Sequence, residues 1–407
     1  MKKDVPMVPT LRFPEFDGEW ESKKSKHLFL NSRSKGNDTL PIYSVTLDQG
    51  LVPRNSLKRK MTNVAKFEGN LAVKAKDIAF NMMRMWQGAV GIANQECMVS
   101  PAYIVLRPQI DVSSDFFIQL FDKKRSLYLF TSYSYGLTSD RLRLYFKDFA
   151  SIKFSTPLFP EQQKIASFLS AVDKKIQQLS RKKELLEQYK KGVMQKIFSH
   201  ENRFKDENDQ EFPPWQDKRL VEIGSTFNGL TGKSANDFGQ GRPFITYKQI
   251  FDDAKIDITK FQYVQVCDGE KQSNVYYGDV LFTTSSETRL EVGVSSVLLD
   301  KIENLYLNSF CFGFRINSHN VFAPEFARYL FRSEQFRAVI IKLGQGSTRY
   351  NISKHMMMGL HIFLPSKDEQ QKISVFLSNI DKKIEAVQIQ HSQTQTFKKG
   401  LLQQMFV

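Results

Sequence analysis

The chain has 407 residues, of which 41% are apolar, and this length favours two or three domains with cores of their own. Lysine and arginine outnumber aspartate and glutamate by 58 to 43, and the net charge of +15 favours a polyanionic partner such as nucleic acid. Cys97, Cys267 and Cys311 are scattered and no apolar stretch has membrane-spanning length, which argues against a disulfide scaffold, a metal cluster and a membrane protein. A cytoplasmic protein without metal or cofactor is expected.

Two segments rich in proline and tryptophan divide the chain. The first 20 residues are irregular and end in FPEFDGEW at 13–20. A polar linker, HENRFKDENDQ at 200–210, leads to a similar segment, EFPPW, at 211–215. The chain therefore reads as one unit repeated: a leading segment, a globular domain and a long helix.

Both globular domains contain short β-branched and aromatic runs separated by glycine and proline, which predict strands. One strand is shared, because AKDIAFN at 75–81 resembles YGDVLFT at 277–283. A short helix is predicted later in each domain, at 115–124 and at 324–336. The domains otherwise diverge, which indicates one scaffold carrying different loops.

A long helix follows each domain, and its sequence occurs twice. EQQKIASFLSAVDKKI at 161–176 returns at 369–384 as EQQKISVFLSNIDKKI, and KKGVMQKIF at 190–198 returns at 398–406 as KKGLLQQMF. Apolar residues recur at alternating spacings of three and four, which predicts a stripe that packs against a partner helix. The two helices are expected to pair in antiparallel fashion; amphipathic helices packed only on their own domains are the alternative. Identity is highest at the helix ends, which favours a partner that binds twice.

The predicted fold class is α+β: two similar α/β domains joined by two long antiparallel coiled-coil helices, with approximate two-fold symmetry. The expected boundaries are 1–158 for the first domain, 159–200 for the first helix, 201–366 for the linker and second domain, and 367–407 for the second helix.

Three motifs suggest chemistry and fail on inspection. GLTGKS at 229–234 lacks the first glycine of a phosphate-binding loop, because Phe227 stands in its place. FPPW at 212–215 resembles an adenine methyltransferase motif, but Phe212 cannot accept a hydrogen bond from the base. The six histidines have no metal-ligand spacing. No catalytic residue is predicted, although a nuclease site assembled from distant carboxylates stays open.

Polar loops follow the shared strands and return near the end of each domain, as MMRMWQG, TSSETRLEVG, SYGLTSDRLR and GQGSTRYNIS. Arginine and glutamine can pair with guanine and adenine edges, and serine can bind bases or phosphates. The predicted DNA contacts in these loops and in nearby basic segments are Arg84, Trp86, Gln87, Arg141, Arg143, Lys233, Lys248, Ser285, Ser286, Arg289, Ser347 and Arg349.

The repeated EQQKI…FL…DKKI…KKG helices, the leading segments, the GDVLF-type strand and the GQGSTRYNIS loop resemble the specificity subunit of type I restriction–modification systems over essentially the whole chain. The resemblance implies two target recognition domains, each reading half of a bipartite, asymmetric double-stranded DNA target, with the helices as spacers. It also implies two modification subunits, which carry the adenine methyltransferase activity, and restriction subunits, so that this chain itself would be non-catalytic. Docking residues for the modification subunits are expected on the repeated helix, at Gln162, Gln163, Phe168, Asp173, Gln370, Gln371, Phe376 and Asp381.

Two other functions remain open at this point. One is a self-contained DNA methyltransferase or nuclease, against which the missing cofactor and methyltransferase motifs argue. The other is a free-standing DNA-binding regulator.

Overall fold

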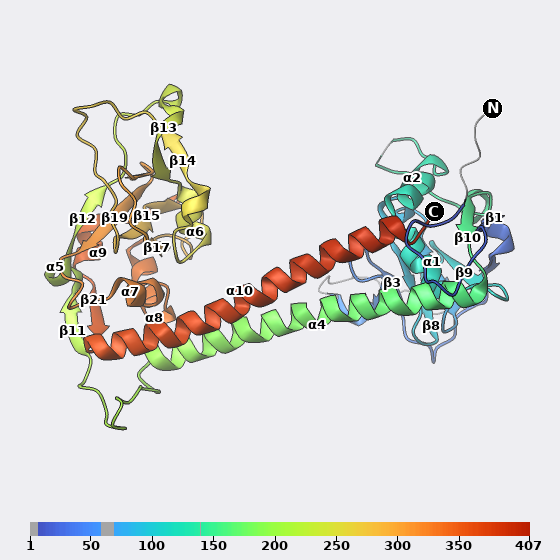
Figure 1. The fold of residues 1–407 in the computed structure, drawn as a ribbon, viewed down its shortest axis with the longest axis horizontal. Helices are drawn as coiled ribbons and strands as arrows, with labels where there is room; N and C mark the ends of the chain where they lie inside the picture. The colour runs from blue at the N-terminus through green and yellow to red at the C-terminus, as the bar shows by residue number, and fades with distance from the viewer. Residues whose placement is uncertain (1–6, 58–68, 139) are drawn as a thin grey trace. The chain divides into compact units, whose positions relative to one another are not determined.

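The computed structural model describes residues 7–57, 69–138 and 140–407. Contacts divide the chain into two compact units, which we call unit 1 (Met1–Arg181 with Gln388–Val407) and unit 2 (Lys182–Val387). Each unit holds a mixed α/β globular part and a portion of both long helices (Figure 1).

Unit 1 is built around a four-stranded antiparallel sheet in the order β2-β9-β6-β7. Its central strand β6 reads IAFN, and Ile78, Ala79 and Phe80 are fully buried because both faces of the strand are covered. The strands are β1 (Glu21–Lys24), β2 (Phe29–Ser32), β3 (Tyr43–Val45), β4 (Leu51–Pro53), β5 (Leu71–Val73), β6 (Ile78–Asn81), β7 (Val90–Ile92), β8 (Cys97–Val99), β9 (Tyr103–Pro108) and β10 (Lys153–Thr156). The short helices are η1 (Ser25–His27), η2 (Arg54–Ser56), η4 (Met85–Gln87), α1 (Ser114–Phe121), α2 (Lys124–Ser132) and α3 (Phe146–Phe149).

Unit 2 repeats that sheet in the order β12-β19-β15-β17 and adds a three-stranded sheet, β14-β13-β18. The strands are β11 (Gln216–Arg219), β12 (Gly224–Asn228), β13 (Phe238–Ile245), β14 (Gln262–Val264), β15 (Val280–Thr283), β16 (Ser285–Ser286), β17 (Ser295–Val297), β18 (Tyr306–Leu307), β19 (Cys311–Ile316), β20 (Tyr350–Asn351) and β21 (His361–Leu364). The short helices are α5 (Leu220–Ile223), η5 (Ala235–Asp237), α6 (Tyr247–Asp252), η6 (Ile258–Lys260), α7 (Pro324–Leu330), α8 (Glu334–Ile340), η7 (Ile341–Leu343) and α9 (Lys354–Met358). The single helix predicted at 324–336 is thus two helices, α7 and α8, and the Ser333 side chain caps the second.

The two long helices are α4 (Phe159–Phe198) and α10 (Lys367–Gln404). In unit 1 the end of α10 packs with the start of α4 in one core, and in unit 2 the end of α4 packs with the start of α10. Within each unit the two helix segments therefore run antiparallel. The predicted α+β fold of two similar domains and two long antiparallel helices is confirmed.

The apolar stripe of each helix packs on the globular cores as well as on the other helix. In unit 1, Leu169 of α4 and Phe406, two residues beyond the end of α10, join a core rich in phenylalanine. In unit 2, Phe198 of α4 and Leu377 of α10 take the corresponding places. The ends of both long helices are thus parts of the domain cores. The apolar stripe therefore packs both on the other helix and on the globular domain, which are the two arrangements considered above.

Candidate nucleic-acid interface

A buried carboxylate fastens the start of each long helix to its own unit. Glu161 is 2% exposed and accepts hydrogen bonds from Arg12 Nε at 2.8 Å and Nη2 at 2.7 Å. Trp20 Nε1 donates to the same carboxylate at 3.4 Å. In unit 2, Arg203 binds the fully buried Glu369 in the same two-pronged manner, at 3.3 and 2.7 Å. The first residue of the repeated motif is therefore a buried anchor.

The glutamine that follows is also buried. Gln162 accepts a hydrogen bond from the Ser113 backbone at 2.9 Å and donates to a backbone carbonyl, and Gln370 does the same with the Ala323 backbone at 2.8 Å. The two side chains are 2% and 0% exposed. Because no surface remains for a partner, Gln162 and Gln370 cannot contact one directly, which corrects that part of the docking prediction.

The repeated aspartates bind inside their own units. Asp173 accepts from Gln119 at 2.8 Å and lies 2.8 Å from Lys398. Asp381 accepts from the Tyr329 hydroxyl at 2.8 Å and pairs with Lys190 at 2.6 Å. These contacts explain the recurrence of the aspartates through folding alone.

Four of the predicted docking residues keep accessible surface. Gln163 and Gln371 are exposed. Phe168 is 36% exposed and meets Phe13 edge to face at 5.8 Å, and the half-buried Phe376 meets Phe204 at 5.5 Å. Of the predicted docking residues on the repeated helix, these four are therefore the ones that a partner subunit could contact.

The shared strand of each unit begins at a buried aspartate. Asp77 is 2% exposed and binds Arg107 through two hydrogen bonds of 3.2 and 2.9 Å. Asp279 is 1% exposed and binds Arg315 at 2.9 and 2.7 Å. Each pair ties the shared strand to its neighbour, β9 or β19, and so sets the position at which the following loop leaves the sheet.

The two predicted contact loops of each unit lie against one another. The Leu144 backbone donates to the Met82 carbonyl at 2.8 Å in unit 1, and the Ile352 backbone donates to the Thr284 carbonyl at 2.9 Å in unit 2. The candidates of both loops therefore gather at one place in each unit.

Glycine shapes the second of these loops in both units. A Cβ atom on Gly136 would collide with the Arg141 carbonyl, and one on Gly346 would collide with the Arg349 carbonyl. Gly346 also has a φ of +127°, which other residues rarely adopt. Both turns therefore depend on a glycine. Counted from the matched backbone donors Leu144 and Ile352, Arg141 and Arg349 lie at corresponding positions.

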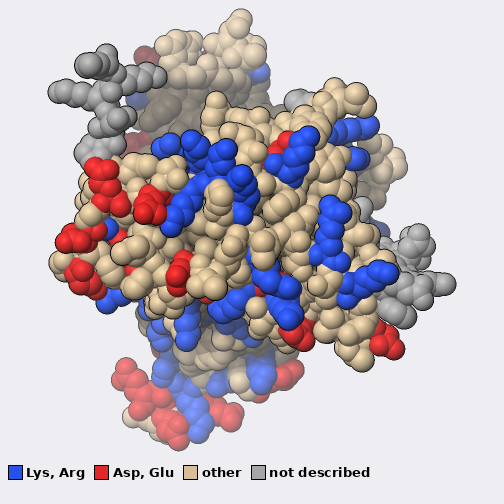
Figure 2. Space-filling model, turned by 90° about the vertical axis from the view of Figure 1, so that its right-hand side faces the viewer, with Lys and Arg blue, Asp and Glu red and all other residues tan. Residues whose placement is uncertain are grey.

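In unit 1, the two contact loops present three exposed arginines and an exposed glutamine. Arg84, Gln87, Arg141 and Arg143 are all exposed, and their side chains have no hydrogen bond or ion pair with any other residue that the structure describes. Trp86 differs, because its Nε1 donates to the Met83 carbonyl at 3.0 Å and stabilises its own loop. Figure 2 shows the side of the molecule at the right of Figure 1, where lysine and arginine side chains gather in several groups, with some acidic side chains between them and more toward the edges. The exposed arginines of the two loops can bind phosphates and the acceptor edges of bases.

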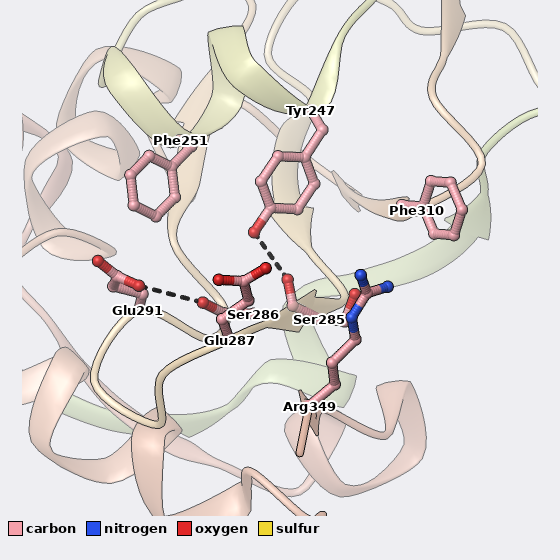
Figure 3. A pocket seen from close by; sticks show the side chains of 8 residues that line it. All are labelled: Tyr247, Phe251, Ser285, Ser286, Glu287, Glu291, Phe310 and Arg349. Atoms are coloured by element: carbon pink, nitrogen blue, oxygen red, sulfur yellow. Dashed lines mark hydrogen bonds between the residues drawn. The ribbon is translucent and has the colours of Figure 1, made fainter. Parts of the chain in front are cut away.

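Unit 2 presents a pocket of about 360 Å³ at the corresponding place (Figure 3). Its floor is the short ladder in which Ser285 pairs with Asn351 and Ser286 with Tyr350. The lining side chains are Tyr247, Phe251, Ser285, Ser286, Glu287, Glu291, Phe310 and Arg349. The fold thus brings Ser285, Ser286 and Arg349 together, as expected for one interface.

Internal hydrogen bonds order the pocket. The Tyr247 hydroxyl donates to the Ser285 carbonyl at 2.7 Å, and the Tyr247 and Phe251 rings stack with centroids 6.2 Å apart. Ser286 Oγ donates to the Glu291 carboxylate at 3.3 Å, and Ser286 as a residue is 8% exposed. Ser286 therefore supports the loop, and the exposed groups around it are left for contact.

Two half-buried arginines hold the walls of the pocket. Arg337 donates to the carbonyls of Gly293 at 2.6 Å and Val292 at 2.7 Å, and Arg332 donates to those of Ile250 and Asp253, both at 2.8 Å. Burial lowers the pKa of each guanidinium to about 10, so that both remain charged at neutral pH. Hydrogen bonds from a charged donor to several carbonyls are strong and directional, so these arginines stabilise the loop that ends at Gly293 and the end of α6.

The remaining candidates lie outside the pocket lining. The Lys233 side chain is only 7% exposed and lies 2.6 Å from Glu270, so its charge is used within the domain. Lys248 is 84% exposed on α6, 2.9 Å from Asp252. Arg289 is exposed and donates to the Ile341 carbonyl at 3.3 Å, and Ser347 is exposed.

Sequence reasoning did not select seven residues that form or brace the pocket: Tyr247, Phe251, Glu287, Glu291, Phe310, Arg332 and Arg337. A sequence signal exists only for the aromatic ones, which lie beside the basic Lys248 and in the NSFCFGF run, an interleaving typical of nucleic-acid surfaces. Nothing in the sequence marks an arginine that will donate to backbone carbonyls.

In the described part of the chain, no group of three or more histidine, cysteine, aspartate or glutamate side chains is placed to hold a metal ion. None of the described helices combines the length and the apolar character needed to cross a membrane.

Comparison with known proteins gives a consistent result. The family described as "Type I restriction modification DNA specificity domain" matches residues 20–188 and again residues 213–393. The type I restriction enzyme MjaVIII specificity subunit of Methanocaldococcus jannaschii is 24% identical over 265 residues, which are 63% of this chain and 61% of that protein. The MjaX specificity subunit of the same organism, provisionally assigned to a type I restriction enzyme, is 28% identical over 214 residues, or 51% of this chain. The chain spans about half, 49%, of the length of that relative.

Solved structures share the fold along nearly the whole chain. The S subunit of a type I restriction–modification system from M. genitalium superimposes with a TM-score of 0.57 at 15% identity, covering 98% of this chain and 99% of that one. A chain from a study of complex assembly and conformational transition of a type I system gives 0.55 at 16% identity, covering 95% and 96%. Because one family accounts for both halves, the chain belongs to the family of type I restriction modification DNA specificity domains and carries that domain twice.

Proposed function

We propose that this chain is the DNA specificity subunit of a type I restriction–modification enzyme and recognises a bipartite, asymmetric target in double-stranded DNA. Residues 1–158 and 201–366 contain the two target recognition domains, and each reads one half-site. The observation that carries the proposal is the pair of corresponding loop clusters, in which Arg84 and Gln87 of unit 1 and Arg349 of unit 2 are exposed and their side chains bond to no other described residue.

The asymmetry of the target follows from side chains at matched positions. Arg141 and Arg349 lie at corresponding positions, but where unit 1 has Arg84 and Gln87 the register of the shared strands places Ser286 and Arg289 in unit 2, with Glu287 between them. Arginine and glutamine select guanine and adenine, whereas a carboxylate selects an amino group. Two unlike half-sites are therefore expected.

The chemistry belongs to partner subunits. The chain binds two modification subunits, which methylate adenine, and restriction subunits, and it directs both to the target. The exposed Gln163, Gln371 and Phe168 offer docking surface on the repeated helix. The candidate interface combines cations, amides, hydroxyls and aromatic rings, which suits binding and supplies no cofactor-binding loop.

Methyl transfer from labelled S-adenosylmethionine tests the proposal. Genomic DNA is incubated with the purified chain alone, with the purified modification subunit of the same system alone, and with both proteins together. Label should enter adenine only when both proteins are present, at sites that share one bipartite sequence. Transfer by this chain alone, or methylation by the partner without it at the same sites, would contradict the proposal.

A further inference from the structure

Glu287 is an exposed carboxylate at the pocket of unit 2, and its side chain has no hydrogen bond or ion pair within the described residues. Its neighbour Glu291 is occupied, because the hydroxyls of Ser286 and Thr288 donate to it at 3.3 and 2.7 Å. Glu287 is thus the free carboxylate of the loop, and Figure 3 shows it near the centre of the pocket lining.

Arg349 lines the same pocket and is equally free. It is exposed, and no described residue bonds to its guanidinium. Glu287 and Arg349 do not form an ion pair with each other, although β16 and β20 bring their chain segments side by side. Because the two charged side chains do not pair with each other, both can form hydrogen bonds with a bound ligand.

A carboxylate on a phosphate-binding face carries a cost, because it repels the DNA backbone. That cost is offset where the carboxylate meets a hydrogen-bond donor. In the major groove the donors are the amino groups of cytosine and adenine, and glutamate accepts from cytosine N4. Arginine complements guanine, whose N7 and O6 are both acceptors.

At the position of Glu287, only unit 2 has a negative charge. By the register that aligns the two shared strands, Met85 stands in unit 1 where Glu287 stands in unit 2, and Met85 is fully buried. Arg349, in contrast, has Arg141 as its counterpart. A feature that is absent from the sister domain is not required by the scaffold, which leaves a role in selectivity.

We propose that Arg349 and Glu287 together read one G·C base pair, with the arginine on guanine and the glutamate accepting from the cytosine amino group. The proposal rests on the proposed function and names the base pair that this site selects. The Tyr247–Ser285 hydrogen bond and the contacts of Arg337 with backbone carbonyls brace the loop that carries Glu287, and a contact with both bases requires such support.

The test uses the full chain assembled with its modification subunits. The recognised sequence is obtained first by mapping methylated adenines, and binding is then measured on duplexes that carry each of the four base pairs at each recognised position. The wild type should reject every alternative to G·C at one position of one half-site. Glu287→Ala and Arg349→Ala should each lower that discrimination by about 5- to 150-fold, the usual worth of such a contact, and at the same position.

Two further measurements separate base reading from a structural role. Glu287→Ala removes a negative charge, so affinity for unrelated DNA at low salt should rise, which loss of folding would not produce. Glu303→Ala, at an exposed carboxylate of the same unit, is the matched control and should leave discrimination unchanged. The inference would be overturned if Glu287→Ala left base discrimination unchanged at every position, or if the two substitutions acted at different positions. In either case a bipartite target recognised by the wild type would still support the proposed function. A wild type that selects no sequence would overturn both.

Discussion

The Lys190 ammonium on α4 lies 2.6 Å from the Asp381 carboxylate on α10. In unit 1 the two helices exchange these roles, since Lys398 of α10 lies 2.8 Å from Asp173 of α4. Each unit therefore takes the aspartate of one helix copy and the lysine of the other. A sequence repeat that looks like duplication for an external partner is used, in large part, to bind the helices to each other and to the domains.

Removing the carboxylate of Asp381 should destabilise unit 2. Lys190 and Arg328 both pair with it, and their side chains are only 24% and 21% exposed. Asp381→Asn leaves both cations without a counter-charge, and we expect a loss of about 1–3 kcal/mol in the free energy of unfolding. Asp173→Asn removes the partner of a single cation and should cost less. Urea unfolding of both variants measures the difference, and Glu385→Gln on the exposed face of α10 is the control; an equal or reversed order would contradict this account.

Glu369 should be the most sensitive position of the repeated helix. It is fully buried and binds Arg203 and Trp215, so Glu369→Gln leaves a half-buried guanidinium without its charge partner. Breaking a fully buried pair costs about 3–5 kcal/mol, and the partial exposure of Arg203 should reduce the cost here. The substitution Gln371→Ala, two residues away and exposed, should change the midpoint of urea unfolding little. Similar midpoints for the two variants would show that the buried pair does not hold the helix.

The sequence predicts the large-scale fold because the repeat is long and free of gaps. It does not reveal Arg12 and Arg203, although LRF at 11–13 and NRF at 202–204 share the arginine and phenylalanine that grip each helix. Their distances to Trp20 and Trp215 differ by four residues, so an alignment without gaps hides the match. Short anchors in irregular segments are visible only when the fold brings them to a common carboxylate.

The contact loops are also predicted, since they follow a shared strand, but the availability of their side chains is not. Lys233 is neutralised by Glu270, which lies 37 residues further along the chain, and Trp86 bonds to its own loop. Pairings of this kind depend on how hairpins fold back, which periodicity and composition do not encode. The free groups could be separated from the occupied ones only in three dimensions.

Arg337 should act as a positioning residue for the pocket. Its guanidinium holds the carbonyls of Leu290, Val292 and Gly293, so Arg337→Lys keeps the charge but cannot reach all three. Loss of these bonds should speed hydrogen exchange of the amides at 287–293 and reduce base discrimination, with affinity for unrelated DNA nearly unchanged. Arg242→Lys, on an exposed arginine of unit 2, is the control. Unaltered exchange in the Arg337 variant would show that the loop is ordered by other contacts.

The most direct test of divided reading compares the two loop clusters. Replacing Arg84 and Gln87 by alanine should relax or abolish recognition of one half-site, and replacing Arg289 and Arg349 should affect only the other. Each lost base contact typically costs about 1–3 kcal/mol.

Methylated-adenine maps from cells that express each double variant decide the question, because they report both half-sites at once. Arg143→Ala serves as a comparison: if this exposed arginine binds phosphate, affinity falls uniformly across sequences and the dependence of log K on log[salt] becomes shallower by about 0.9. A base contact would instead relax one position. If either double variant weakens recognition of both half-sites, the loops serve general DNA binding or folding. Residues that each contact only one half-site should not change the base preference at the other.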